Sequence, residues 1–245
     1  MKILGVIPAR YGSTRFPAKA LADIAGKSMI QRVYEQASKA TSLTKVIVAT
    51  DHGDIQQHVA DFGGNVCMTG DHHRSGTERC GEVLQKEGES YDYVINIQGD
   101  EPFISPDQIN LLASLSAHKV ELGTLIKHID NQEDLFNPNV VKAITKKSGE
   151  AIYFSRHPIP YQRDNQENWI AKHRYFKHIG IYAYRSDILP TICQLDSSSL
   201  EMAESLEQLR WIENGFGIHT LETKLESLGI DTPEDLKRAI AYIQS

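Results

Sequence analysis

The sequence predicts an α/β fold with a Rossmann-like, mostly parallel mixed sheet, flanking helices and one small lobe. Short apolar runs at residues 3–7, 46–49 and 93–98 predict buried strands. Helical patterns separate these runs, and strands that alternate with helices at this spacing indicate parallel βαβ units. A chain of 245 residues is long enough for one large core. We expect a single domain over residues 1–245, with the smaller lobe at about 155–200.

Composition narrows the class of protein. The net charge is −6, with 40% hydrophobic and 24% charged residues, and the chain has no long run of Lys and Arg. This balance argues against a nucleic-acid partner or an anionic membrane. The apolar start is too short for a signal peptide and no segment has the length of a membrane span, so we expect a cytoplasmic protein. Three cysteines without C-x-x-C spacing predict neither disulfides nor a zinc site.

The loop after the first strand combines small residues with cations. Pro8 ends the strand, and the loop runs to Lys19. The small residues are Gly12, Ser13 and Thr14, and the cations are Arg10, Arg15 and Lys19. Backbone amides and fixed positive charges can surround an anion from several sides, which predicts polyphosphate binding. The alternative interpretation is a solvated basic loop.

Two common phosphate-binding signatures do not fit this chain. A dinucleotide fold requires G-x-G-x-x-G after the first strand, where only Gly12 is present. A Walker loop requires a glycine five residues before Gly26, and Leu21 stands there. The sequence therefore supports neither a redox cofactor nor a P-loop hydrolase.

The following elements continue the βα alternation. Ser28 is the expected N-cap of a helix over about 28–40, followed by the strand at 46–49. A helix over about 53–62 and a short strand at 66–68 complete two βα units.

Residues 70–79 form a second informative loop. Ser75, Gly76 and Thr77 combine hydroxyls with a flexible backbone, and Glu78 falls in the first turn of the next helix. A plain helix cap explains this pattern equally well. The neighbouring pair His72-His73 is expected to be a polar surface loop rather than a metal site, because adjacent residues rarely face one ion.

An acidic pair follows the strand at 93–98. Gly99 is followed by Asp100 and Glu101. A carboxylate at the end of a buried central strand suits Mg²⁺, which proteins hold with one or two carboxylates plus substrate phosphates. We predict Asp100 as a metal ligand; the alternative is a solvated loop carboxylate.

The second half of the chain departs from simple βαβ order. We expect a helix that begins at Ser105-Pro106, a strand at 122–129 and a hairpin that pairs 140–144 with 151–154. Residues 155–175 show little periodicity and are expected to leave the sheet. A strand at 178–184 and a helix at about 200–214 follow. Thr232 as N-cap and Pro233 at the first position predict the last helix.

Several motifs together resemble a known family. The chain reads P-A-R-x-x-S-x-R-F-P-x-K at 8–19, S-G-T-E-R at 75–79, Q-G-D-E-P at 98–102, S-R-x-x-I-P at 155–160, H-x-G-I-Y at 178–182, E-Q-L-R at 207–210 and D-T-P-E-D at 231–235. This set resembles the sugar nucleotidyltransferases that activate acidic sugars with CTP, and among them the 3-deoxy-manno-octulosonate (Kdo) cytidylyltransferases. The resemblance covers the whole chain, with the motifs in the family's order.

The resemblance implies a reaction and its site residues. It implies transfer of CMP from CTP to the anomeric hydroxyl of Kdo, an acidic eight-carbon sugar, with release of pyrophosphate, for the lipopolysaccharide inner core. It implies Mg²⁺ on Asp100 and Asp231, and a homodimer. The implied catalytic residues are Arg10, Lys19, Asp100 and Asp231. The implied nucleotide-binding residues are Pro8, Ala9, Arg10, Ser13, Arg15, Lys19, Ser75, Gly76, Thr77, Arg79 and Gln98. The implied sugar-binding residues are Gln98, Arg156, His178, Tyr182, Glu207 and Gln208.

Three alternatives remain open at this stage. One is a cytidylyltransferase for another acidic sugar, such as 8-amino-8-deoxy-Kdo or a sialic acid, because the sequence alone does not place the pocket residues. A uridylyl- or guanylyltransferase would differ in the base loop at 75–79. A non-catalytic module would bind CTP without releasing pyrophosphate, although the retained Lys19, Asp100 and Asp231 argue against it. No Cys/His pair or G-x-S-x-G elbow is present, so we expect no covalent enzyme intermediate.

Two segments depart from the family's usual pattern. Relatives commonly carry glycine before the loop lysine, where this chain has Ala18. Alanine restricts the loop backbone relative to glycine. Residues 224–228 lack the P-G-T often found before the final aspartate. Both departures keep the charged residues.

Overall fold

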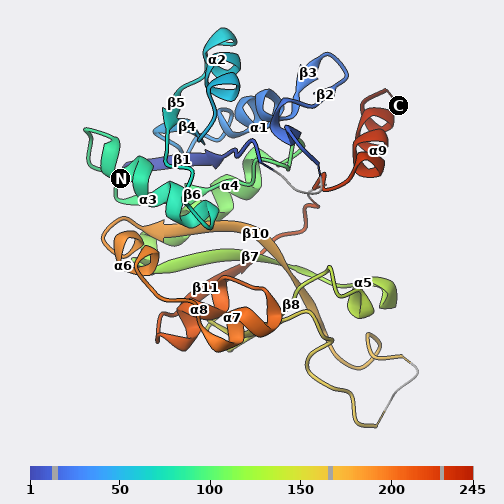
Figure 1. Ribbon diagram of the computed structural model, residues 1–245. Helices are drawn as coiled ribbons and strands as arrows, with labels where there is room; N and C mark the ends of the chain where they lie inside the picture. The colour runs from blue at the N-terminus through green and yellow to red at the C-terminus, as the bar shows by residue number, and fades with distance from the viewer. Residues whose placement is uncertain (13–15, 165–167, 227–228, 245) are drawn as a thin grey trace. The chain divides into compact units, whose positions relative to one another are not determined.

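The computed structural model describes residues 1–12, 16–164, 168–226 and 229–244 (Figure 1). The chain forms two compact units, one of Met1–Ala113 with Glu226–Ser245 and the other of Ser114–Leu225. The smaller lobe at about 155–200 stays a prediction. No helix in the described ranges is both long and apolar enough to cross a membrane.

The first unit contains a parallel four-stranded arrangement. Its strand order is β6 (Tyr93–Asn96), β1 (Ile3–Pro8), β4 (Lys45–Thr50) and β5 (Val66–Met68). Each neighbouring pair is parallel. Every residue of β6, and every residue of β1 except Pro8, is buried, as expected for strands covered on both faces. The strands predicted at residues 3–7, 46–49 and 93–98 are confirmed as β1, β4 and β6.

Helices connect and flank these strands. They are α1 (Met29–Ala37), α2 (Gly53–Asp61), α3 (Gly76–Lys86), α4 (Pro106–Ala113) and α9 (Pro233–Gln244). Ser28 caps α1 as predicted, because its side chain accepts a hydrogen bond from the Gln31 N–H at 3.2 Å. A short hairpin of β2 (Asp23–Ile24) and β3 (Lys27–Ser28), which the sequence did not indicate, precedes α1.

The order of the strands predicts where a ligand would bind. The chain moves from β1 outward to β4 and β5, and then returns to the other side of β1 to form β6. Right-handed crossovers therefore put α3 on the face opposite α1 and α2. The switch lies between β1 and β6, and open α/β sheets bind ligands outside the carboxyl ends of the strands at such a point.

The second unit is a mixed sheet. Strand β7 (Leu122–His128) pairs with parallel β11 (Ile218–Glu222) and with antiparallel β10 (Phe176–Arg185). The predicted hairpin is confirmed as β8 (Lys142–Thr145) and β9 (Ala151–Ser155), and β8 also pairs with β10. The unit also contains the short helices η2 (Ser114–His118), α5 (Gln132–Phe136) and α6 (Leu189–Cys193).

One predicted helix is wrong. Instead of a continuous helix over 200–214, the chain forms α7 (Ser199–Glu204) and α8 (Gln208–Glu213). Ser205 separates them, because its φ of 52° lies in the left-handed region and ends α7. Glu207 consequently stands at the start of α8 rather than in mid-helix.

The stretch between β9 and β10 contains no helix or strand within its described residues, as expected. Its aromatic residues are nevertheless packed. Trp169 and Tyr175 form a buried cluster with Ile129 and Leu135. This cluster gives an irregular segment its own small core.

Candidate active site

Two segments of the first unit approach Pro8 at the carboxyl end of β1. A Cβ atom at Gly99 would lie 2.5 Å from the Pro8 carbonyl oxygen, and one at Gly76 would lie 3.2 Å from the Pro8 ring. Only glycine permits the first approach, since real Cβ contacts are not that short. The loop after β6 and the start of α3 therefore both lie against the start of the predicted phosphate loop.

The predicted phosphate loop is closed at its base. The Ala18 N–H donates to the Tyr11 carbonyl oxygen at 3.2 Å, and the Ala9 N–H donates to the Ala49 carbonyl oxygen at 2.8 Å. Ala18 has a φ of 54°, so alanine adopts a left-handed backbone here. Arg10 is exposed, while Ser13 and Arg15 lie outside the described residues.

The two predicted metal ligands are brought together, although they are far apart in sequence. The Ile230 N–H donates to the Asp100 carbonyl oxygen at 2.9 Å, which fixes the final loop against the loop after β6. The Asp235 carboxylate accepts hydrogen bonds from the backbone N–H groups of Asp231 and Thr232, at 3.1 and 2.9 Å. Asp231 is thus held by the cap of α9, whose N-cap Thr232 was predicted.

Lys19 joins these two carboxylates. It lies in the short helix η1 (Lys19–Leu21), and its Nζ is 2.7 Å from Asp100 Oδ2 and 3.2 Å from Asp231 Oδ1. Lys19 is only 17% exposed at its side chain. Two carboxylates that face one cation are a donor set that fits Mg²⁺, which proteins bind through one or two carboxylates. The assignment of Asp100 and Asp231 to Mg²⁺ stays a prediction.

The predicted base-binding segment begins α3. Ser75 is the N-cap, because its Oγ accepts from the Glu78 N–H at 3.3 Å. The cap interpretation is therefore correct, and it leaves base binding as a prediction. Gly76 is tightly packed, and Thr77 is buried.

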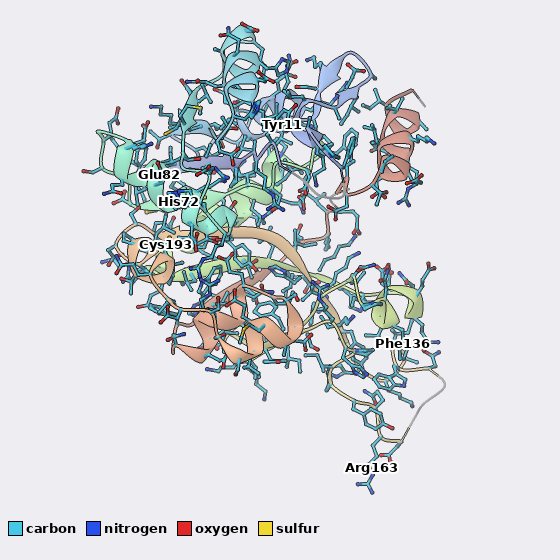
Figure 2. All side chains as sticks on the ribbon, in the orientation of Figure 1. Tyr11, His72, Glu82, Phe136, Arg163 and Cys193 are labelled. Carbon is cyan, nitrogen blue, oxygen red and sulfur yellow. The ribbon has the colours of Figure 1, made fainter. Side chains whose placement is uncertain are left out.

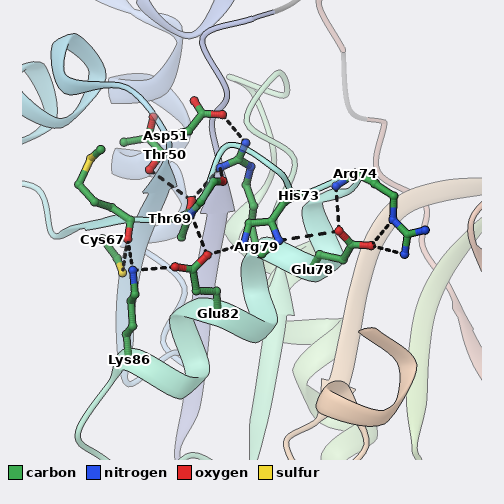
Figure 3. A network of polar contacts seen from close by, with 12 residues as sticks. Thr50, Asp51, Cys67, Thr69, His73, Arg74, Glu78, Arg79, Glu82 and Lys86 are labelled. Carbon is green, nitrogen blue, oxygen red and sulfur yellow. Dashed lines mark hydrogen bonds and ion pairs between the residues drawn. The ribbon is translucent and has the colours of Figure 1, made fainter. Parts of the chain in front are cut away.

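Arg79 is buried and bonded within the protein (Figure 3). Its Nη1 donates to Thr69 Oγ1 at 2.7 Å and to the Gly70 carbonyl oxygen at 3.1 Å, and its Nη2 pairs with Asp51. Sequence reasoning missed Asp51. Its only signal was an acidic residue directly after a buried strand that neighbours β1.

Glu82 fixes the loop before α3 from one turn further along the helix (Figures 2 and 3). Its carboxylate accepts from the Gly70 N–H at 2.9 Å and pairs with His73 and, at 2.6 Å, with Lys86. Partial burial opposes ionisation, but the hydrogen bonds from Lys86 and His73 outweigh it and lower the pKa of Glu82 to about 2. The His72-His73 loop, predicted as a polar surface, has one of its histidines engaged in this network.

Most of the predicted sugar-binding residues belong to the second unit, where three lie together. The His178 and Tyr182 rings are 5.2 Å apart, and the charge of Glu207 acts on Tyr182. Desolvation and that charge raise the pKa of Tyr182. Gln208 is buried on α8. Gln98 is half-buried in the first unit.

His178 is held in one protonation state. Desolvation lowers its pKa to about 3, although the residue as a whole is only half-buried. Thr124 Oγ1 lies 2.9 Å from His178 Nε2 and 2.8 Å from the Ile181 carbonyl oxygen. The same hydroxyl lies 3.1 Å from the Ile179 carbonyl oxygen, and its single proton can be donated to only one of these three partners.

Arg156 is engaged with backbone carbonyl groups. Its Nε donates to the Glu204 oxygen at 2.7 Å, Nη1 to the Pro138 oxygen at 3.1 Å and Nη2 to the Ser205 oxygen at 3.3 Å. A guanidinium has five N–H donors, so these bonds use three of them. The predicted contact between Arg156 and a sugar carboxylate remains possible only through the other two or by rearrangement.

The parallel sheet, its switch point and the carboxylate–lysine cluster define a nucleotidyltransferase of the α/β class. The chain matches the model of the cytidylyltransferase family over residues 4–238, and it belongs to that family. It is 55% identical to the 3-deoxy-manno-octulosonate cytidylyltransferase of Cytophaga hutchinsonii, over 97% of this chain and 96% of the relative. It is 53% identical to the enzyme of the same name from Parabacteroides distasonis, over 99% and 98% of the two chains.

A solved structure agrees with the fold over the full chain. The structure of CMP:2-keto-3-deoxy-manno-octonic acid synthetase complexed with CTP aligns with a TM-score of 0.92 and 43% identity. The alignment covers 100% of this chain and 99% of that chain. The predicted fold class, with a mostly parallel mixed sheet and flanking helices, is confirmed.

Proposed function

We propose that this enzyme transfers CMP from CTP to the anomeric hydroxyl of Kdo and releases pyrophosphate. The observation that carries the proposal is the Lys19 cluster, in which one ammonium contacts both Asp100 and Asp231. Nucleotidyl transfer needs this concentration of cation and carboxylates at the phosphates. The high identity to Kdo cytidylyltransferases supports the choice of base and sugar.

The residues that we assign to the nucleotide belong to the first unit. We assign Lys19 and Arg10, with Arg15 and Ser13 of the same loop, to the triphosphate, where their charge offsets the charge that develops during transfer. Asp100 and Asp231 would hold Mg²⁺, which would offset negative charge on the triphosphate and favour ionisation of the attacking hydroxyl. Gly76 and the residues around it are assigned to the cytosine ring.

We assign His178, Tyr182, Glu207 and Gln208 to the sugar hydroxyls, and Arg156 to its carboxylate. These residues assigned to the sugar belong to the second unit. A neutral imidazole suits a sugar hydroxyl rather than an anion. Positive charge for the carboxylate must therefore come from another residue, which favours Arg156.

The reaction proceeds by direct attack. The anomeric oxygen forms a bond to the α-phosphorus, the bond to the pyrophosphate oxygen breaks in line, and the hydroxyl proton leaves to solvent or a phosphate oxygen. The chain's own residues position and neutralise charge rather than act as nucleophiles.

Product analysis tests this proposal. Incubation of the enzyme with CTP, Mg²⁺ and Kdo should give CMP-Kdo by mass spectrometry, with one pyrophosphate per product. Isolation of a CMP–protein adduct would contradict direct attack. Binding of CTP without product from Kdo, 8-amino-8-deoxy-Kdo or a sialic acid would instead indicate a nucleotide-binding module.

We further propose a homodimer that acts in the cytoplasm and supplies the lipopolysaccharide inner core. Two exposed aromatic residues support association through the second unit. Phe136 (Figure 2) and Tyr161 are 49% and 63% exposed, and both contact the Trp169 ring edge-on. Sedimentation of Tyr161→Glu beside the unmodified enzyme tests this: a shift to monomer is expected, and an unchanged dimer would remove this patch from the interface.

A further inference from the structure

Asp51 contacts both segments that the proposed function assigns to the nucleotide. It follows β4 directly, and its two carboxylate oxygens have different partners, of which Figure 3 shows the Arg79 guanidinium. Oδ2 pairs with the guanidinium of Arg79 on α3, which carries the base-binding segment. Oδ1 accepts from the Tyr11 N–H at 3.4 Å, within the phosphate loop.

The ion pair between Asp51 and Arg79 is shielded from water. The side chains are 15% and 4% exposed. A buried charge pair is costly to break, because the remaining partner keeps an uncompensated charge. Arg79 also donates to Thr69 and Gly70, so the pair fixes the start of α3 against the ends of β4 and β5.

The phosphate loop has a second attachment at the same place. The Tyr11 ring stacks on the His52 ring, with centroids 3.8 Å apart and 14° between the planes. His52 is itself fixed, because its Nδ1 accepts from the Asp54 N–H at 3.2 Å as the N-cap of α2. Two residues that follow β4 therefore hold Tyr11: Asp51 bonds its backbone N–H, and His52 packs against its ring.

We propose that Asp51 is a positioning residue that holds the phosphate loop and the base-binding segment in register, so that one nucleotide is bound by both. It acts through Tyr11 and Arg79 and does not touch the nucleotide. The inference deepens the proposed function and depends on it for the identity of the ligand. It also assigns Arg79 an indirect role, in place of direct contact with the base.

Two substitutions at Asp51 distinguish the contact with Arg79 from the contact with the Tyr11 N–H. Asp51→Asn keeps an oxygen for the Tyr11 N–H but loses the charge that pairs with Arg79. Asp51→Ala loses both contacts. Asp61→Asn is the matched control, because Asp61 is an exposed aspartate at the other end of α2.

Calorimetric dissociation constants for CTP, cytidine and tripolyphosphate form the test, at a fixed Mg²⁺ concentration. Asp51→Asn should raise the dissociation constants for cytidine and CTP by about tenfold and leave that for tripolyphosphate unchanged. Asp51→Ala should raise the dissociation constants for all three ligands. Asp61→Asn should have the same three constants as the unmodified enzyme.

Two outcomes would overturn the inference. One is folded Asp51→Ala protein with all three constants unchanged. The other is a loss confined to cytidine in Asp51→Ala, which would limit Asp51 to the base segment. If circular dichroism shows that Asp51→Ala does not fold, Arg79→Lys serves as the second variant. It keeps the positive charge but removes the guanidinium group that bonds Asp51, Thr69 and Gly70 together. It should weaken the binding of cytidine and leave the binding of tripolyphosphate unchanged.

Failure of this inference is distinguishable from failure of the proposed function. If the unmodified enzyme binds CTP but no sugar gives pyrophosphate, the proposed reaction is wrong. The binding constants of the Asp51 variants still decide whether Asp51 joins the two segments.

Discussion

Lys19 and Asp100 form an ion pair of 2.7 Å at the carboxyl end of the parallel sheet. The same ammonium reaches Asp231 at 3.2 Å. A cation shared by two carboxylates offsets their mutual repulsion in the absence of another positive charge. The proposed Mg²⁺ would bind the same carboxylates, so metal and lysine compete for them until the triphosphate attracts the lysine.

Replacement of Asp100 by Asn should remove most of the activity. The change deletes one carboxylate from the proposed metal pair and keeps the shape of the side chain. We expect kcat/KM to fall by at least about 100-fold, with a higher Mg²⁺ requirement. Steady-state rates measured across a Mg²⁺ titration check this. Asp107→Asn, an exposed aspartate on α4, should behave like the unmodified enzyme; equal activity of the two variants would contradict the assignment.

Replacement of Lys19 by Met should separate catalysis from metal binding. Loss of the ammonium should lower kcat by about 100- to 1000-fold, the range seen when a group that stabilises transition-state charge is removed. Affinity for Mn²⁺ without nucleotide should increase, because the competing cation is gone. Electron paramagnetic resonance of bound Mn²⁺ measures this directly. Lys27→Met, which removes only an exposed ion pair with Glu35, is the control; weaker Mn²⁺ binding in Lys19→Met alone would refute the competition.

His178 should make stability depend on pH. Its pKa is about 3 in the folded state and about 6.5 in the unfolded state, so between these pH values the unfolded chain binds a proton that the folded chain does not. The free energy of unfolding is therefore highest above about pH 6.5. It falls by up to about 1.4 kcal/mol for each pH unit below that value. Urea unfolding of His178→Asn and the unmodified enzyme at several pH values measures the difference. Exposed His118→Asn is the control, and parallel curves for His178→Asn and the unmodified enzyme would contradict the assignment.

Ala18→Gly should relieve backbone strain in the phosphate loop. A φ of 54° destabilises folded alanine by about 1–2 kcal/mol. Glycine avoids this strain, but its greater freedom in the unfolded chain destabilises the fold by about 0.4–1 kcal/mol. The variant should therefore be more stable by a few tenths to about 1 kcal/mol, measured by urea unfolding. Ala22→Gly is the matched control, because Ala22 has a φ of −58° and gains only the entropic cost. Equal destabilisation by both changes would show that Ala18 is not strained.

Local patterns predicted the fold well where a residue's role depends on its neighbours in sequence. Ser28, Ser75 and Thr232 cap helices as expected, since a cap bonds to an N–H two or three residues away. The break at Ser205 was not predictable, because serine carries no general signal for a left-handed backbone.

The site was predictable to a smaller extent, because its geometry depends on contacts between distant segments. Asp100 and Asp231 were recognised one by one from motifs, but their common partner Lys19 follows only from packing. Arg79 was assigned to the nucleotide from its motif, and its bond to Asp51 could not be read from the sequence. Glu82 carried no motif at all, although it fixes the same loop.

The most direct test is pyrophosphate release from CTP and Mg²⁺ in parallel reactions with Kdo, 8-amino-8-deoxy-Kdo and a sialic acid, with UTP as the base control. We predict rapid release with CTP and Kdo, and little with UTP. A clear preference for another sugar would keep the reaction and change the substrate. No release with any sugar, despite measurable binding of CTP, would contradict the account.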